Sequence, residues 1–317
     1  MRCMDKSITI SVALFAVTLF LLSFTLSANA QILYSCESPF GEDNPFLHII
    51  NPNTGATIST TEITLAGQTV RGCNGMAKHP ETGVCYVMLN ITPRPEEGPI
   101  PPRVLATIDQ DTGVATSIGG VEETFASIAF TPDGTLYGVT GDGGATPETL
   151  FTINILNGSP TFVTALGNGD DGEVLAFNPI DELIYHGSGN GAPYNNPTGQ
   201  IFEAIDPNTL QITPRAIQGT PVLDETFEEQ SSMVYNRVNN IFLTGTIDEI
   251  FFAITSNGDV TELGAMDHVT KGLAFDCGIP TKLARPIPTL SEWGLIAMAG
   301  ILGFVGFMVI RRRKVAA

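Results

Sequence analysis

One register of an internal repeat carries side chains that could bind a ligand or move protons. The five positions are Arg71, Glu123, Asp170, Glu228 and His268. Each stands six residues before a small residue of its own repeat, and these small residues are Ala77, Ala129, Ala176, Val234 and Ala274. If the repeats are equivalent structural units, the five side chains form a ring. We take this ring as the candidate ligand face.

Carboxylates are frequent around this ring and allow two kinds of chemistry. The adjoining acidic residues are Glu122, Asp171, Glu173, Asp224, Glu225, Glu229 and Asp267. Oxygen-rich loops suit hard cations, Ca²⁺ first, and a carboxylate pair about 5 to 9 Å apart can hydrolyse a glycoside. However, the chain has no EF-hand spacing and its four histidines form no HExxH or HxH motif. We therefore expect no metal and no other cofactor, and we assign no catalytic residue.

The repeat itself shows which elements position these side chains. Each copy has an apolar strand, a tight turn, a second strand, a polar loop, and then two further strands joined by a turn. The second copy, for example, reads LATIDQDTGVATSIGG and then SIAFTPDGTLYGVT. The small residues are 52, 47, 58 and 40 residues apart. Four strands per unit at this spacing are typical of β-propeller blades.

The two ends of the repeat region complete each other. The fifth copy stops after GLAF without its fourth strand, whereas residues 32–35 align with the fourth strands of other copies. We therefore predict an all-β, five-bladed β-propeller over residues 31–277, closed by the N-terminal strand. We expect the third strands to lie well out from its channel. The alternatives, an open β-solenoid or a sandwich, would leave strand edges unpaired.

Such a ring has two faces that differ in their connections. Short turns such as NPNTG, HPETG and TPDG use Gly, Asn, Asp or Pro where a tight turn needs them, so their similarity is structural. They form what we call the turn face. Longer and more varied connections, such as NITPRPEEGPIPPR and GSGNGAPYNNPTG, form the opposite loop face. Because ligand sites usually lie on loops held by a rigid scaffold, we expect any site there.

The N-terminus is predicted to direct export. Arg2 and Lys6 precede an apolar run, and Ala28-Asn29-Ala30 has the small-x-small pattern of a cleavage site. We interpret residues 1–30 as a signal peptide, and an uncleaved anchor is the alternative.

The C-terminal residues 287–317 combine a short polar motif, an apolar span and a basic end. After IPTLSEWG, residues 295–310 form a predicted transmembrane helix about 24 Å long, against about 30 Å for a bilayer core. By the positive-inside rule, the basic stop at 311–314 should face the cytoplasm. This tail resembles the IPTL-CTERM sorting tail of exported bacterial proteins, a relative of the PEP-CTERM tails handled by exosortase-type machinery. The sorting motif consists of Ile287, Pro288, Thr289, Leu290, Trp293, Gly294, Arg311, Arg312 and Arg313.

The resemblance implies a location and a partner. The protein would be anchored in the inner membrane at least transiently, handled by membrane sorting machinery, and then placed in the cell envelope, at the surface or outside the cell. Residues 278–286 would be the linker between the propeller and the tail. Whether the tail is cleaved is left open.

The exported body is strongly acidic. Of the 15 Lys and Arg and 33 Asp and Glu of the chain, 9 and 31 lie within residues 31–286, a net charge of about −22. Such a surface disfavours nucleic acid and anionic membranes and favours cationic partners. Cys36, Cys73, Cys85 and Cys277 remain after export and permit two disulfides in three alternative pairings.

These observations predict a non-enzymatic, exported propeller that acts as a binding or structural module. The alternative is a secreted, glycosidase-like hydrolase with paired carboxylates on the loop face. That alternative requires acidic side chains that converge at the channel mouth, at least one of them with a raised pKa. The sequence does not identify a ligand or an oligomeric state.

Overall fold

The computed structural model describes residues 31–38, 45–91, 103–141, 143–166, 171–189, 199–223, 227 and 229–279. The chain divides into two compact units after Ile32, and every described strand lies in the unit that begins at Leu33. The predicted signal peptide, sorting motif and transmembrane helix lie outside the described residues. Within these ranges, no helix is long and apolar enough to cross a membrane.

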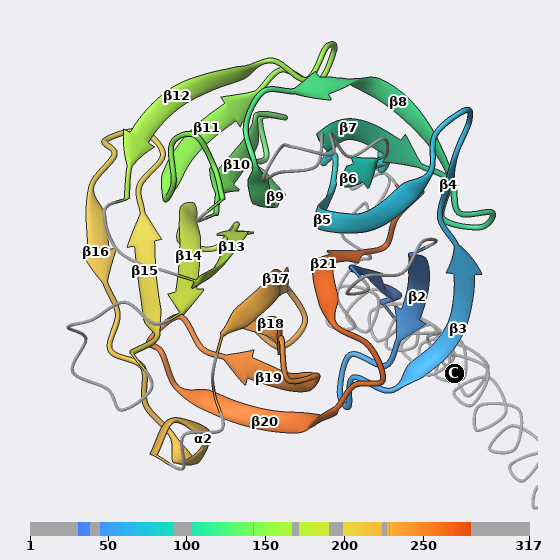
Figure 1. The fold of residues 1–317 in the computed structure, drawn as a ribbon. Coiled ribbons are helices and arrows are strands. Elements are labelled where there is room, and N and C mark those ends of the chain that lie inside the picture. Colours follow the sequence, from blue (N-terminus) through green and yellow to red (C-terminus); the bar gives the residue numbers. More distant parts are fainter. Residues whose placement is uncertain are drawn as a thin grey trace, which may run out of the picture. The chain divides into compact units, whose positions relative to one another are not determined.

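Five sheets follow one another around a common axis, which is the predicted five-bladed propeller (Figure 1). Blade 1 contains β5 (Val70–Lys78), β6 (Cys85–Ile91), β7 (Arg103–Ile108) and β8 (Val114–Val121), with β4 (Thr64–Leu65) parallel to β8. Blade 2 contains β9 (Phe125–Phe130), β10 (Leu136–Thr140), β11 (Thr149–Ile153) and β12 (Pro160–Ala165). Blade 3 contains β13 (Asp171–Asn178), β14 (Leu183–Gly189), β15 (Ile201–Ile205) and β16 (Ile212–Pro214).

One short helical turn, the only one among the described residues, precedes the last two blades. The short helix α2 (Thr220–Leu223) lies between blades 3 and 4 in the chain. Blade 4 contains β17 (Gln230–Asn236), β18 (Ile241–Thr246), β19 (Ile250–Ile254) and β20 (Val260–Ala265). Blade 5 contains β21 (Thr270–Phe275), β1 (Leu33–Glu37), β2 (Phe46–Ile50) and β3 (Thr57–Glu62).

The predicted closure by the N-terminal strand is confirmed. Strand β1 lies between β21 and β2, and Leu33 is opposite both Phe275 and Ile50. The blade boundaries predicted from the repeat are wrong by two strands, because each copy joins the two outer strands of one blade to the two inner strands of the next. A repeat defines a period, but any starting point within the period fits the sequence equally well.

The predicted position of the third strands is also wrong. They are the innermost strand of each blade, namely β5, β9, β13, β17 and β21, and each contacts its two neighbours around the axis (Figure 1). Small residues permit this approach. A Cβ added at Gly272 of β21 would lie 2.7 Å from the Met76 backbone nitrogen and 2.8 Å from the Gly75 carbonyl carbon of β5. The innermost strands therefore meet backbone to backbone.

We expect Gly272→Ala to lower the free energy of unfolding by about 1–3 kcal/mol, because the added methyl overpacks this contact. Urea denaturation of the purified protein measures the loss. Gly120→Ala in β8 is the matched control, since the nearest atom to its added Cβ is 4.0 Å away. The control should change stability by less than about 0.5 kcal/mol, and equal losses in both variants would contradict the packing argument.

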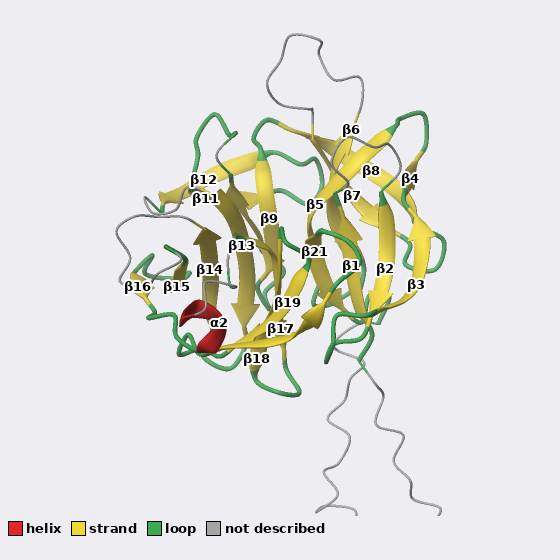
Figure 2. Ribbon diagram, turned by 60° about the horizontal axis from the view of Figure 1, so that its bottom comes forward, coloured by secondary structure: helices red, strands yellow, loops and turns green. Residues whose placement is uncertain are grey.

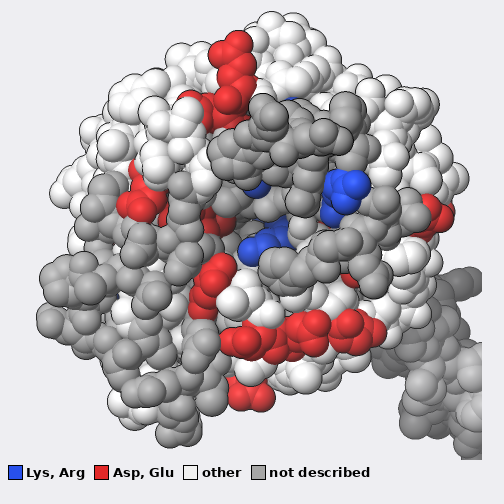
Figure 3. Space-filling model, viewed as in Figure 1, with Lys and Arg blue, Asp and Glu red and all other residues white. Residues whose placement is uncertain are grey.

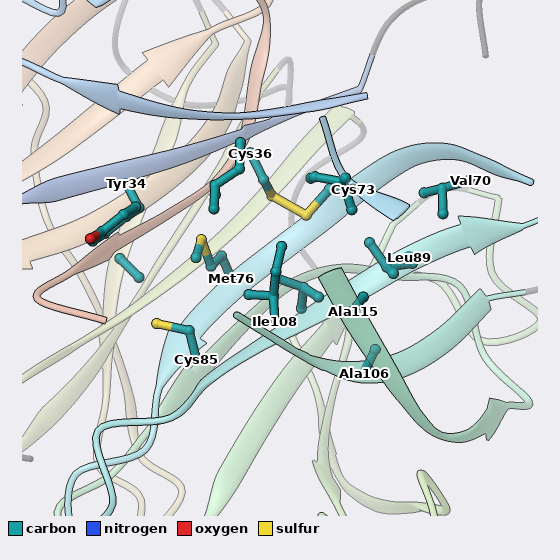
Figure 4. Packing of buried hydrophobic residues seen from close by; sticks show 14 of the residues in the cluster. Tyr34, Cys36, Val70, Cys73, Met76, Cys85, Leu89, Ala106, Ile108 and Ala115 are labelled. Atoms are coloured by element: carbon teal, nitrogen blue, oxygen red, sulfur yellow. A yellow bond between two sulfur atoms is a disulfide. The ribbon is translucent and has the colours of Figure 1, made fainter. Parts of the chain in front are cut away.

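The structure selects one of the three disulfide pairings. Cys36 of β1 is bonded to Cys73 of β5, and Cys85 of β6 is bonded to Cys277, which follows β21. All four cysteines are buried in the apolar cluster between blades 5 and 1, together with residues such as Met76 (Figure 4). Both disulfides thus join the blade that closes the ring to blade 1.

Both ends of the propeller lie on the turn face (Figure 2). Leu33, where β1 begins, is paired with Phe275, where β21 ends. Just after β21, the Gly278 amide donates a hydrogen bond to the Gly83 carbonyl oxygen in the β5–β6 turn at 2.8 Å. The chain therefore enters and leaves on the face opposite the long connections.

Candidate functional site

The structure describes three of the five residues predicted to form the candidate ligand face; Asp170 and Glu228 lie outside the described residues. Arg71 is half-buried near the loop-face end of β5. Glu123 lies two residues before β9, and its Oε1 accepts a hydrogen bond from Thr146 Oγ1 at 2.9 Å. These two residues lie at neighbouring innermost strands. His268 behaves differently.

His268 is buried and points into blade 5. Its Nε2 lies 2.8 Å from Ser35 Oγ of β1, and its Nδ1 lies 2.9 Å from Asp267 Oδ1. The ring stacks on His48 of β2, with 3.8 Å between ring centroids and 12° between planes. This polar cluster, which we call the histidine pair site, is thus a junction between the N-terminal and C-terminal strands of the closing blade.

Ser35, His268 and Asp267 have the hydrogen-bond order of a nucleophile, a general base and an orienting acid. Ser35 is 0% exposed, however, and its hydroxyl oxygen also lies 2.7 Å from Thr270 Oγ1. An acyl group must come within about 3 Å of an attacking oxygen, and a hydroxyl enclosed in this way offers it no approach. The geometry is therefore that of a satisfied buried network.

The pKa values in this cluster support a neutral His268. Burial and the nearby charge of His48 lower the pKa of His268 against the opposing effect of Asp267. Hydrogen bonds from Thr57 and His268 lower the pKa of Asp267, which stays ionised. At neutral pH the cluster therefore holds an aspartate beside an uncharged imidazole.

A second buried histidine has the opposite character. His186 of β14 is hydrogen-bonded through Nε2 to Glu173 of β13, and its Nδ1 lies 3.0 Å from Glu203 Oε1 of β15. Ser188 Oγ donates a hydrogen bond to Glu173 Oε1 at 2.8 Å. Burial lowers the pKa of His186, but the charges and hydrogen bonds of the two glutamates outweigh it and raise the pKa to about 10. The group is an imidazolium held between two carboxylates inside blade 3.

Charge is unevenly distributed over the loop face. Figure 3 shows the basic groups near the centre of this face and most acidic groups farther out. Arg71 and Lys271 lie near the loop-face ends of the neighbouring strands β5 and β21. Arg103 begins β7, its guanidinium donates to the Phe125 carbonyl oxygen, and burial lowers its pKa to about 10. The face thus combines a basic centre with an acidic periphery.

The described residues bear on the metal and on the raised carboxyl pKa that the two kinds of chemistry would require. Among the residues that the structure describes, no group of three or more His, Cys, Asp and Glu is arranged to hold a metal ion. Where the pKa of a carboxyl group departs clearly from its usual value it is lowered, as at Asp109, Asp133, Asp206 and Asp267. The first three belong to short turns, so these shifts arise from turn hydrogen bonds.

The decisive comparison concerns the C-terminal tail. A family model described as the IPTL-CTERM motif matches residues 285–314, which include all nine residues predicted to form the sorting motif. This chain carries an IPTL-CTERM motif. The IPTL-CTERM motif indicates an exported protein with a cell-envelope location. The match covers the tail alone and gives no information about the role of the propeller.

The body of this IPTL-CTERM protein has weaker similarities. A chain in the crystal structure of a mitotic checkpoint complex is similar over 73% of this chain and 75% of its own, with 14% identity and a TM-score of 0.39. An oligogalacturonate lyase in complex with manganese is similar over 71% of this chain and 62% of its own, with 13% identity and a TM-score of 0.38. No curated protein matches the chain. Similarities this weak carry no inference about activity.

The buried polar clusters around His268 and His186 were not predicted from the sequence, although polar residues in the innermost strands indicate them. The innermost strands change character along their length: β17 reads Gln-Ser-Ser before Met233, and β21 reads Thr-Lys-Gly before Leu273. The polar half lies toward the loop face and the apolar half toward the turn face. Alignment of these polar triplets would have identified Gln230, Glu173 and Thr270 as buried polar positions.

Proposed function

We propose that this protein is a membrane-tethered propeller that presents its loop face to the cell exterior as a non-enzymatic binding surface. The observation that carries the proposal is the exit of both chain ends on the turn face. Anchored there, the loop face would point away from the membrane. Its varied connections and uneven charge would then be accessible to a partner.

The segment between the propeller and the predicted membrane helix limits the distance between them. Residues 280–294 would span at most about 50 Å if fully extended. Asp109, Asp133 and Asp206 lie in turns of the turn face, where hydrogen bonds lower their pKa values, so each carries a negative charge at neutral pH. Anionic lipid headgroups would repel this face, so we expect the propeller to be suspended near the membrane without adsorbing to it.

The charge pattern suggests the chemistry of the partner. The acidic periphery of the loop face favours cationic groups, and the central Arg71 and Lys271 favour an anionic group (Figure 3). We therefore expect a ligand that carries both, or a cationic protein surface with one acidic residue. Long-range attraction of this kind mainly accelerates association, so binding should weaken as salt rises.

Cysteine labelling on intact cells tests the orientation. We expect Glu122→Cys, at an exposed loop-face position, to react with a bulky maleimide about tenfold faster than Asp111→Cys, at an exposed turn-face position. The second position is shielded because it lies in the turn beside Gln110, against which Gly278 packs where the chain leaves the propeller. The same two variants in detergent are the control, and they should react at similar rates.

Two outcomes would contradict the proposal. Faster reaction at the turn-face cysteine on cells would reverse the orientation. A hydrolytic activity lost in the double variant Asp170→Asn/Glu228→Gln would instead favour the glycosidase-like alternative.

A further inference from the structure

The closing blade is held differently on its two sides. Toward blade 1, two disulfides cross the interface. Toward blade 4, the described contacts are non-covalent: Leu33, Ile50 and Leu273 pack with Leu243 and Phe251, and Ser231 Oγ donates to the Thr270 carbonyl oxygen at 2.7 Å. If the ring opens anywhere at blade 5, it opens toward blade 4.

The histidine pair site belongs to this non-covalent side. Side chains alternate along a strand, so Ser35 shares a face of β1 with Leu33, and His48 shares a face of β2 with Ile50. Leu33 and Ile50 are members of the cluster that contacts blade 4. Thr270 also contacts blade 4, because a Cβ added at Gly245 of β18 would lie 2.2 Å from its Cγ2. The Thr270 side chain therefore packs directly against Gly245 of blade 4.

Every imidazole nitrogen of the pair has a partner suited to a neutral ring. Glu37 Oε2 lies 3.1 Å from His48 Nε2, and Thr60 Oγ1 lies 3.3 Å from His48 Nδ1. In His268, Nδ1 can donate to Asp267 while Nε2 accepts the single Ser35 hydroxyl hydrogen, and the Ser35 oxygen can then accept from the Thr270 hydroxyl 2.7 Å away. One neutral tautomer of each ring satisfies all four contacts.

Protonation disturbs this arrangement in two ways. A protonated ring no longer accepts a hydrogen bond, so the Ser35 and Thr60 hydroxyls must turn away from it. Two protonated rings would also place like charges 3.8 Å apart in a buried site. The charges that act on His268 are those of His48, Asp267 and Glu37. The blade 4 residues that contact this side of blade 5, namely Ser231, Leu243, Gly245 and Phe251, are uncharged.

We propose that the histidine pair site makes the joint between blades 4 and 5 acid-sensitive. At neutral pH the joint is closed, and at mildly acidic pH it opens while the disulfides keep blade 5 attached to blade 1. The propeller would thereby change from a closed ring to an open one without losing a strand. This property does not depend on the ligand or on the orientation proposed above.

The direction of the pH effect follows from His268. Its pKa in the folded protein is below the unfolded value of about 6.5. The stabilising contribution of the neutral ring is therefore present above about pH 6.5 and is lost as the pH falls toward the folded pKa. Because this loss is confined to one joint, we expect local opening before global unfolding.

Hydrogen exchange on the full chain in detergent tests the proposal, with protection factors compared at about pH 7.5 and about pH 5, on either side of the ordinary histidine pKa. We expect protection in β1 and β2 to fall about tenfold or more at the lower pH, because the joint opens locally while the rest of the fold stays closed. Protection in β6 and β7, on the disulfide-bonded side, should stay unchanged. An equal response of both regions would overturn the proposal.

Two variants test whether the acid response comes from the histidine pair site or from another histidine. His48→Gln keeps an amide that can donate to Glu37 but cannot be protonated, so the acid response of β1 and β2 should shrink. His79→Gln, in the β5–β6 turn, is the matched control and should respond as the unaltered protein does. If His48→Gln does not fold, NMR titration of the unaltered protein decides, because a His268 that titrates at or above the ordinary value would overturn the proposal.

Discussion

Removal of the Cys85–Cys277 disulfide is expected to lower the free energy of unfolding by about 5 kcal/mol. The bond joins residues 192 apart in sequence, and cross-linking a chain over so long a loop restricts the unfolded state strongly. It also fixes the end of β21, which enters blade 5 from the far end of the chain. The double variant Cys85→Ala/Cys277→Ala, compared with the unaltered protein by urea denaturation, measures the effect.

The other disulfide supplies the matched control. Cys36 and Cys73 are 37 residues apart, so Cys36→Ala/Cys73→Ala should lose about 4 kcal/mol. Both bonds are buried in the same cluster, and the comparison therefore isolates loop length. A larger loss from the shorter loop would show that packing around the sulfur atoms decides the stability of the joint.

The second large effect is expected at His186. His186→Leu should destabilise the protein by about 3–5 kcal/mol, because it leaves Glu173 and Glu203 buried without their shared cation. The triple variant Glu173→Gln/His186→Leu/Glu203→Gln, which removes all three charges, should recover much of this loss. If the single and triple variants are equally unstable, the cost comes from altered packing and the ionic argument is wrong.

The pH dependence of stability provides an independent check of this site. The pKa of His186 is raised to about 10 in the folded protein, above its unfolded value of about 6.5. Its contribution to stability is therefore complete below about pH 6.5 and is lost as the pH rises toward 10. We expect the unaltered protein, but not His186→Leu, to weaken over this alkaline range in urea denaturation. The acid response of the histidine pair site has the opposite sign.

The ring and its closure could be predicted because their signals are local. Asp, Asn, Pro and Gly in the turns mark strand ends, and the missing fourth strand of the fifth copy pointed to residues 32–35. The sorting motif was predictable for the same reason, since its residues are contiguous and lie within the matched range 285–314. Short linear patterns of this kind need no tertiary contact to be recognised.

The polar sites could not be predicted in the same way because they depend on register between distant strands. Ser35 and His268 are 233 residues apart. They meet only because β1 pairs with β21 in the register that places Leu33 opposite Phe275, and a register shifted by one residue would separate them. A shift by one residue would have turned Ser35 toward blade 1. For the same reason, the side-chain direction of His268, which lies two residues before β21, could not be predicted from the repeat.

The disulfide pattern has a consequence for maturation. If the predicted signal peptide directs export from the N-terminus, Cys36, Cys73 and Cys85 reach an oxidising compartment well before Cys277. Native pairing joins the first cysteine to the second and the third to the fourth. An oxidase that pairs cysteines in order of arrival would produce this connectivity directly, and no isomerase would be needed. On that route Cys85 would wait for its native partner until translocation is almost complete, and the ring would close only then, because β21 and Cys277 come last.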